Sequence, residues 1–369
     1  MIDKRIEKLA DLLVNYSVEV KKGDNVVIQG NTVAEPLVNS VYAKVLQAGG
    51  NPLVMVQPTS AEEIYYKYAS EEQLQHVPPP EKLVIETYDA RIVVWGIENT
   101  KALTNVDPVK TVLHSSARRG LMKTALQREA KGELSWVIAL FPTNAPAQDA
   151  EMSLSEYEDF VFGACMPNMD DPITYWRNVS AKQQKIIDWL KGKKNVRIKG
   201  PETDLRFSIE GRKFINCDGK NNMPDGEVFT GPVEDSMQGN VYFSYPAIYD
   251  DREVVGVRLW FEKGRVVKAS AEKNEEFLLK TLDTDEGARH VGEFAIGTNT
   301  GITKFTRQIL FDEKINGSFH LALGAGFPES GSRNESAIHW DMVCDLRQGG
   351  QIWIDDQLLY RDGKFVLNL

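Results

Sequence analysis

The sequence predicts a mixed α/β protein with an N-terminal doubly wound parallel α/β domain, residues 1–190, and a C-terminal β-rich α+β domain, residues 191–369. Three observations predict this fold class. Short β-branched apolar runs alternate with segments of helical period in the first half of the chain. Strand-like pieces dominate after residue 194. A chain of 369 residues also exceeds what one hydrophobic core usually serves.

The first half of the chain is predicted to form successive β-α-β units. An amphipathic helix is predicted before Lys21, because apolar residues recur there at helical spacing. Short apolar runs then predict strands that are separated by helical segments, which is the pattern of a parallel sheet. The predicted strands are Asn25–Gln29, Leu53–Val56, Arg91–Trp95 and Trp136–Phe141, with a helix over 36–47 between the first two.

The middle of the chain is predicted to be helical from Ser153 to near residue 190. Ser153 and Glu156 have the spacing of a capping box at the start of this region. The basic, glycine-containing stretch 191–194 then marks the domain boundary near residue 190. The strands predicted after it are Val196–Ile198, Leu205–Ile209, Val241–Tyr245, Val255–Phe261, Arg265–Ala271, Ser318–Leu323 and Gln351–Ile354.

The composition excludes several classes of protein. A hydrophobic fraction of 42% and a charged fraction of 26% are those of a globular chain and not of a disordered one. The formal charge of −10 disfavours nucleic acid as a partner. The first residues alternate charged and apolar side chains, unlike a secretory signal, and the longest apolar runs are too short to span a membrane. We therefore expect a cytoplasmic protein that binds neither membranes nor nucleic acid.

Two familiar kinds of functional motif are missing from the sequence. Gly30-Asn31-Thr32 follows the first predicted strand but lacks the glycine fingerprint of a dinucleotide-binding loop, which argues against a nucleotide enzyme. The cysteines Cys165, Cys217 and Cys344 are far apart and have no C-x-x-C spacing. They predict buried thiols, with neither a disulfide framework nor a cysteine zinc site.

Two of the five histidines lie in settings that suit chemistry. His339 and Asp341 are two residues apart at a predicted strand, so both side chains project from one face while Trp340 points away. Such a pair serves either as metal ligands or as an acid-base pair. His320 lies in an otherwise apolar strand. Taken alone, His320 is better explained as a hydrogen-bonded histidine of the core.

Buried carboxylates favour a metal-binding role for His320 over the role of a hydrogen-bonded core histidine. Glu227 and Glu293 both lie in apolar, glycine-flanked segments. A buried ionised carboxylate costs several kcal/mol unless it is paired or binds a cation. Two histidines with three or four carboxylates exceed the needs of one tetrahedral zinc ion, and they suit two divalent ions bridged by a carboxylate.

The sequence also resembles the aminopeptidase T family of dinuclear metallopeptidases, the thermophilic-type leucyl aminopeptidases. The resemblance covers most of the chain and several motifs in the same order. These motifs are Phe141–Thr143, Ala147–Phe160, Gly226–Thr230, Gly292–Phe294, His320–Gly324 and Ile338–Asp341. The resemblance implies a metal-dependent exopeptidase that acts on peptides and forms a cytoplasmic homodimer. It also implies metal ligands at Glu227, Glu293, His320, His339 and Asp341, with Glu313 as a sixth.

One position departs from the family pattern. The family's active-site tyrosine comes seven residues after the first histidine, where this sequence has Phe327. A hydroxyl that can bind a metal or stabilise an oxyanion is therefore replaced by a ring without one.

The sequence thus predicts hydrolysis of the N-terminal residue of peptides by two divalent ions, which could be zinc, cobalt or manganese. The metals are expected in the C-terminal domain, with the α/β domain helping to wall the cleft. Glu293 is the predicted bridging ligand, and Glu227 is either a ligand or the general base. One alternative is a ring-opening dioxygenase that holds a single iron with His320, His339 and Asp341, although it has no need of Glu227 or Glu293. Another is a peptide-binding homologue that is catalytically weak.

Overall fold

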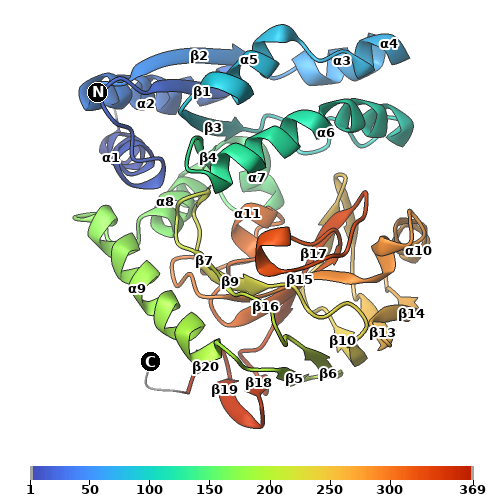
Figure 1. Ribbon diagram of the computed structural model, residues 1–369. Coiled ribbons are helices and arrows are strands. Elements are labelled where there is room, and N and C mark those ends of the chain that lie inside the picture. The colour runs from blue at the N-terminus through green and yellow to red at the C-terminus, as the bar shows by residue number, and fades with distance from the viewer. Residues whose placement is uncertain (1–2, 367–369) are drawn as a thin grey trace. The chain divides into compact units, whose positions relative to one another are not determined.

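The computed structural model describes residues 3–366, which form two compact units. The first unit contains residues up to 173 (blue to green in Figure 1) together with 219–224. The second contains 174–218 and the chain from 225 onward. No helix among the described residues is long and apolar enough to cross a bilayer.

The first unit contains a parallel sheet with the strand order β2-β1-β3-β4-β8. Its apolar, β-branched strands have the composition typical of a sheet that is covered on both faces. The strands are β1 (Asn25–Asn31), β2 (Asn51–Gln57), β3 (Ala90–Gly96), β4 (Ser135–Phe141) and β8 (Asn222–Met223). The four strands predicted in this half of the chain are therefore correct, and the two-residue β8 was not predicted.

Helices connect these strands in the doubly wound manner that the sequence predicts. Strand order changes direction between β1 and β3, so right-handed crossovers place α2 on one face and α5 and α6 on the other. The helices are α1 (Lys4–Leu12), which continues as a π-helical turn (Leu13–Ser17), α2 (Glu35–Ala48), α3 (Ala61–Tyr68), α4 (Glu71–Gln75), α5 (Pro79–Thr87), α6 (Pro108–Ala130), α7 (Asn144–Asp149) and α8 (Leu154–Cys165), with a 3-10 turn at Thr32–Ala34. The predicted capping box is present, because Ser153 Oγ accepts a hydrogen bond from Glu156 N and Glu156 Oε2 accepts one from Ser153 N.

The second unit is built from antiparallel sheets and carries a long helix, α9 (Pro172–Leu190). The larger sheet has the order β14-β13-β10-β6-β5-β18-β19-β20. Its strands are β5 (Asn195–Gly200), β6 (Thr203–Ser208), β10 (Gln238–Tyr242), β13 (Arg258–Glu262), β14 (Arg265–Ser270), β18 (Gln351–Ile354), β19 (Gln357–Arg361) and β20 (Lys364–Phe365). The ribbon β11 (Ala247–Tyr249) and β12 (Arg252–Val254) is separate.

A smaller sheet of this unit, with the order β17-β16-β15-β9-β7, carries the predicted site residues. Its strands are β7 (Ile215–Cys217), β9 (Glu227–Thr230), β15 (Val291–Gly297), β16 (Ser318–Gly324) and β17 (His339–Asp345). The helices α10 (Glu275–Leu282) and α11 (Ile309–Asp312) and the 3-10 turns Gly287–Arg289 and Pro328–Ser330 lie in the connections. The C-terminal half is therefore the β-rich α+β region that the sequence predicts.

One face of the smaller sheet belongs to the hydrophobic core of the second unit. Alternate residues of β15, β16 and β17 are buried in it, together with residues of the larger sheet, and the rings of Phe207 and Phe294 lie 5.0 Å apart. The buried members on this face are Val291, Phe294, Ile296, Phe319, Leu321, Leu323, Trp340, Met342 and Cys344. Because strand side chains alternate, the intervening residues point to the other face.

The compact units divide between residues 173 and 174, in the first turn of α9, whereas the sequence predicts a domain boundary near residue 190, where α9 ends. The physical reason is packing. Ile186 and Leu190 of α9 are buried in the core of the second unit, so the helix is grouped with the strands that follow it. The basic stretch after residue 190 is a turn between α9 and β5 within that unit.

Candidate metal centre

The register of the smaller sheet places five of the predicted residues on one face. Ala322 of β16 is paired with Glu293 of β15 on one side and with Asp341 of β17 on the other, and directly paired residues point the same way. His320 and His339 lie two residues before Ala322 and Asp341 on their strands, so they share this face. Glu227 shares it as well, because it is paired with Gly297, four residues after Glu293.

A β-bulge turns Glu293 to this face. Val291 and Glu293 are two residues apart and would share a face in a regular strand, but Val291 lies in the core. The register shifts between them at Gly292, which re-aims the side chain of Glu293. A Cβ atom at Gly292 would lie 2.4 Å from the carbonyl oxygens of Gly324 and Ala325, so only glycine fits.

Glu227 is fixed by a second glycine. Gly226 has a φ of +117°, which side chains rarely adopt, and a Cβ atom there would lie 2.9 Å from Asn299 Cβ. Its N–H donates to the carbonyl of Cys217 at 3.1 Å, and its own carbonyl accepts from Thr298 N at 2.8 Å. The backbone is therefore held on both sides immediately before Glu227.

Two carboxylates span the two imidazoles. Glu293 Oε1 lies 3.5 Å from His320 Nε2, and Glu293 Oε2 lies 3.5 Å from His339 Nε2. Asp341 repeats the arrangement, with Oδ1 3.8 Å from His320 Nε2 and Oδ2 3.4 Å from His339 Nε2. Glu227 Oε2 lies 3.7 Å from His320 Nε2. Carboxylate oxygens thus surround each imidazole, and Glu293 and Asp341 each contribute one oxygen to both.

Backbone carbonyls orient both imidazoles. Nδ1 of His320 lies 2.9 Å from the carbonyl of Glu313, and Nδ1 of His339 lies 2.8 Å from the carbonyl of Ala325. When Nδ1 carries the proton and donates to a carbonyl, Nε2 presents its lone pair. In both residues Nε2 is the atom that faces the carboxylates.

Burial and dense negative charge set the electrostatics of the centre. Burial alone would lower the pKa of His320, but the adjacent Glu293 carboxylate and the charges of Glu227 and Asp341 outweigh it and raise the pKa to about 10. The pKa of His339 is also raised to about 10, against the effect of burial, chiefly by Asp341. Burial would raise the pKa of Asp341, but His339 holds it below its usual range. The centre therefore favours positive charge strongly.

Glu313 and the following residue complete the cluster. Glu313, His320 and Asp341 offer donor atoms that all lie within 4.8 Å of one another. The Nζ atom of Lys314 contacts Glu313 Oε1 and lies 3.9 Å from Glu227 Oε1. Burial would lower the pKa of Lys314, but Glu313, Glu227 and Asp225 raise it above its ordinary value, so the side chain is an ammonium. The sequence does not predict this lysine in the site, because a charged run usually lies in solvent.

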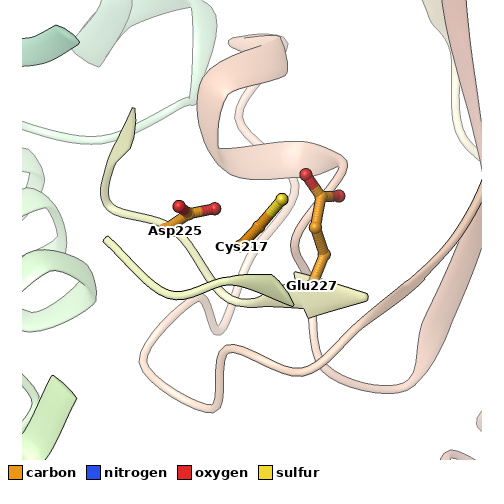
Figure 2. A group of neighbouring side chains, drawn as sticks. All are labelled: Cys217, Asp225 and Glu227. Carbon is orange, nitrogen blue, oxygen red and sulfur yellow. The ribbon is translucent and has the colours of Figure 1, made fainter. Parts of the chain in front are cut away.

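Cys217 and Asp225 were also missed. Figure 2 shows the thiol of Cys217 between the carboxylates of Asp225 and Glu227, and the donor atoms of the three lie within 4.8 Å of one another. Burial, with Asp225 and Glu227, raises the pKa of Cys217 well above its ordinary value, so the thiol keeps its proton. The position of Asp225 directly before Gly226-Glu227 was a signal that could have pointed to it.

Phe327 lies at the edge of the cluster. Its ring is 5.3 Å from the ring of His339, edge to face, and 5.3 Å from the ring of Phe229. Phe327 is 38% exposed and the side chain of His339 is 31% exposed, whereas the other side chains of the cluster are more deeply buried. Phe327 therefore borders the centre.

The family model described as thermophilic metalloprotease (M29) matches residues 2–365 of the chain. The chain belongs to this family. M29 membership makes the protein a metal-dependent peptide hydrolase, which agrees with the predicted enzyme class.

Known members of the M29 family match nearly the whole chain. Aminopeptidase T of Thermus thermophilus is 28% identical, covering 98% of this chain and 96% of that protein. Aminopeptidase 2 of Geobacillus stearothermophilus is 26% identical, covering 92% of each. The structure of wild-type AmpT from Thermus thermophilus matches with a TM-score of 0.85 at 26% identity over 100% of both chains. The predicted family and fold class are confirmed.

The dioxygenase hypothesis is not supported. The structure of 2,5-dihydroxypyridine dioxygenase from Pseudomonas putida KT2440 matches with a TM-score of 0.62, covering 98% of this chain and 96% of that one, but at 14% identity. A likeness at this level shows a shared fold alone. The M29 match decides between the two enzyme classes in favour of the peptidase.

The residues present fit the metal that an M29 metalloprotease requires. Metal bonds of about 2.0–2.1 Å in a tetrahedral site place neighbouring donor atoms about 3.4 Å apart. The donor pairs around His320 and His339 are separated by 3.4–3.8 Å. Glu227 Oε2 and Asp341 Oδ1 are also buried with no hydrogen-bond partner among residues 3–366. Such atoms are costly to bury unless a cation satisfies them.

Proposed function

We propose that this chain is an aminopeptidase that removes the N-terminal residue of peptides with two divalent metal ions. The observation that carries the proposal is the position of Glu293, whose two oxygens face two different imidazoles at 3.5 Å each. A carboxylate so placed suits a bridge between two cations. The names of the relatives, all aminopeptidases among those reported above, support the exopeptidase activity.

The proposed ligand sets share residues. Glu293 and His320 would hold one ion, with Glu227 beside it as a third ligand or as the base, and Glu293, His339 and Asp341 would hold the other. Glu313 is proposed as an additional ligand beside His320 and Asp341. This assignment uses all six residues that the sequence predicts as metal ligands.

In the proposed mechanism, the bound ions supply Lewis-acid polarisation of the scissile carbonyl and make water more acidic. Glu227 accepts a proton from the attacking water through Oε2, which faces His320 and has no hydrogen-bond partner among the described side chains. The water oxygen bonds to the carbonyl carbon, the carbon–nitrogen bond breaks, and Glu227 returns the proton to the leaving amine. His339 and Phe327 border the partly exposed side, from which we propose that the peptide approaches.

Zinc, cobalt and manganese are the proposed metals, because each accepts mixed imidazole and carboxylate ligands. We also propose that the enzyme acts in the cytoplasm as a homodimer, on peptides and not on nucleic acid or membranes. The acidic formal charge of −10 supports the exclusion of nucleic acid.

A comparison of peptides with free and blocked N-termini tests the proposal. An aminopeptidase should hydrolyse an unmodified tripeptide and leave its N-acetylated form intact, because the free amine is part of the recognised group. Equal cleavage of both peptides would contradict the exopeptidase assignment.

Glu227→Gln separates the two roles of Glu227. If Glu227 is the base, kcat should fall by roughly 100-fold or more while both ions are retained. If Glu227 serves only as a ligand, the variant should lose one ion per chain. Elemental analysis of the same preparation that is assayed distinguishes these results.

A further inference from the structure

Lys314 is a fully buried lysine inside the carboxylate cluster, and the proposed mechanism gives it no role. Its side chain has a relative exposure of 0%. Lysine is rarely buried to this extent unless it is paired, because removing an ammonium from water is costly. The fold therefore keeps this cation at the site in spite of its desolvation.

The backbone holds Lys314 from two directions. Its N–H donates to the carbonyl of Phe311 in α11 at 3.0 Å, and its carbonyl accepts from Asn299 N at 3.0 Å. A Cβ atom at Gly297 would lie 2.2 Å from the carbonyl oxygen of Ile315, so the chain packs closely there against the end of β15. Lys314 thus enters the cluster from a fixed backbone position.

The two oxygens of Glu227 have different neighbours, the ammonium of Lys314 and the imidazole of His320. Nζ of Lys314 pairs with Glu227 Oε1 at 3.9 Å and contacts Glu313 Oε1. The other oxygen, Glu227 Oε2, lies 3.7 Å from His320 Nε2. Oε1 is thus the oxygen paired with the ammonium, and Oε2 is the oxygen paired with the imidazole of His320.

The same ammonium also serves as the positive partner of the carboxylates in the group formed by Cys217, Asp225 and Glu227 (Figure 2). The charge of Lys314 acts on both Asp225 and Cys217, in addition to Glu227. These carboxylates therefore already have a positive partner that the chain itself supplies. We assign no metal ion to this group.

We propose that Lys314 is a positioning residue, whose ammonium fixes the carboxylate of Glu227 so that Oε2 is directed at the metal centre for proton transfer. This inference rests on the proposed role of Glu227 as the base. Lysine suits the task, because its compact point charge on a flexible stem can sit between several carboxylates. Loss of a partner that orients a residue of a metal site typically costs 10–100-fold in activity.

The test removes the charge without leaving an excess of buried carboxylates. Lys314→Met keeps the length and apolar character of the stem, but by itself it leaves buried carboxylates without their cation, which can prevent folding. Asp225→Asn, made together with it, removes one negative charge and restores the balance without altering a proposed metal ligand. Asp225→Asn alone is the reference for the double variant.

Arg212→Met is the matched control for loss of a buried cation. Arg212 pairs with Glu234 at 2.5 Å, its side chain is 7% exposed, and neither residue belongs to the metal cluster. This variant should lose thermal stability while its kcat stays that of the wild type.

The variants are compared by kcat, KM, metal content and thermal unfolding, with a dipeptide substrate and saturating zinc. We expect Lys314→Met/Asp225→Asn to fold, to bind two ions and to keep KM within about threefold of Asp225→Asn, with kcat lower by roughly 10–100-fold. A kcat within threefold of Asp225→Asn would overturn the inference, since Lys314 would then only balance charge. Loss of metal from the double variant would overturn it too, since Lys314 would then build the metal site itself.

The wild-type enzyme separates a failure of this inference from a failure of the proposed function. If the wild type lacks peptidase activity or binds fewer than two ions, the proposed function is wrong. If the wild type behaves as proposed and the double variant is unimpaired, only the role of Lys314 is wrong.

Discussion

Ala322→Val tests whether metal ions lie on the proposed face of the sheet. Ala322 is fully buried and is paired with Glu293 on one side and Asp341 on the other. The carboxylates of these two residues both reach the same two imidazoles, so they converge over the methyl group of Ala322. Valine would place two more methyl groups in the space that the ions require.

The magnitude follows from the cost of overpacking. Extra methyl groups in a well-packed interior cost about 1–3 kcal/mol. Because this cost falls only on the metal-bound state, it weakens metal binding by roughly 5- to 150-fold. Folding itself should be little affected in the metal-free protein, because valine is favoured in strands. We therefore expect weaker metal binding and lower activity without a matching loss of thermal stability.

The assay is titration of metal-free wild type and variants with zinc, followed calorimetrically, with thermal unfolding of the same samples. Ala322→Gly is the matched control, because it changes the same residue but leaves the space open; it should bind zinc as the wild type does and lose about 0.5–1 kcal/mol of stability. Zinc binding by Ala322→Val within threefold of the wild type would refute the placement of the ions over this residue.

Two further predictions concern side chains of the centre itself. His339→Ala, Asp341→Ala and Glu293→Gln should each abolish turnover while leaving the chain folded, because the first two remove donors from one strand face and an amide is a poor bridge between two cations; near-normal turnover of any of the three in excess metal would mean that the proposed ligand set is wrong. Phe327→Tyr should raise kcat for a dipeptide, because the ring borders His339 and a hydroxyl there can stabilise the developing oxyanion, an interaction whose loss elsewhere costs roughly 100-fold or more. An unchanged or lower rate in Phe327→Tyr would remove this position from the catalytic argument.

The parallel sheet could be predicted from the sequence because its strands are marked locally. Each of β1 to β4 is a run of apolar, often β-branched residues next to a segment of helical period. β8 carries no such signal. Its two residues join the sheet beside β4 although they follow it by more than eighty positions in the chain, and only the tertiary fold brings them there.

The histidines and Asp341 could be predicted because strand alternation is a local rule, and the structure confirms that His339 and Asp341 share a face while Trp340 is buried in the core. The orientation of Glu293 could not be predicted in this way. In a regular strand it would share a face with the core residue Val291, and the bulge at Gly292 that reverses it depends on contacts with Gly324 and Ala325.

Charged residues whose partners are distant in the sequence could not be predicted either. Lys314 follows two acidic residues, and such a run of charges is typical of a solvent-exposed segment. Its side chain is nevertheless fully buried beside Glu227, which lies far away in the chain. The grouping of α9 with the second unit is of the same kind, since it depends on which core receives Ile186 and Leu190. Local patterns carry no information about such partners.

The number of metal ions per chain tests the central claim most directly. Protein purified without added metal is stripped with a chelator, dialysed and reconstituted with zinc, cobalt or manganese, and metal content and peptidase activity are measured on the same samples. The account predicts that stripping abolishes activity and that activity returns as the content reaches two ions per chain. Saturation at one ion per chain with full activity would contradict the bridging role of Glu293 and with it the two-metal mechanism.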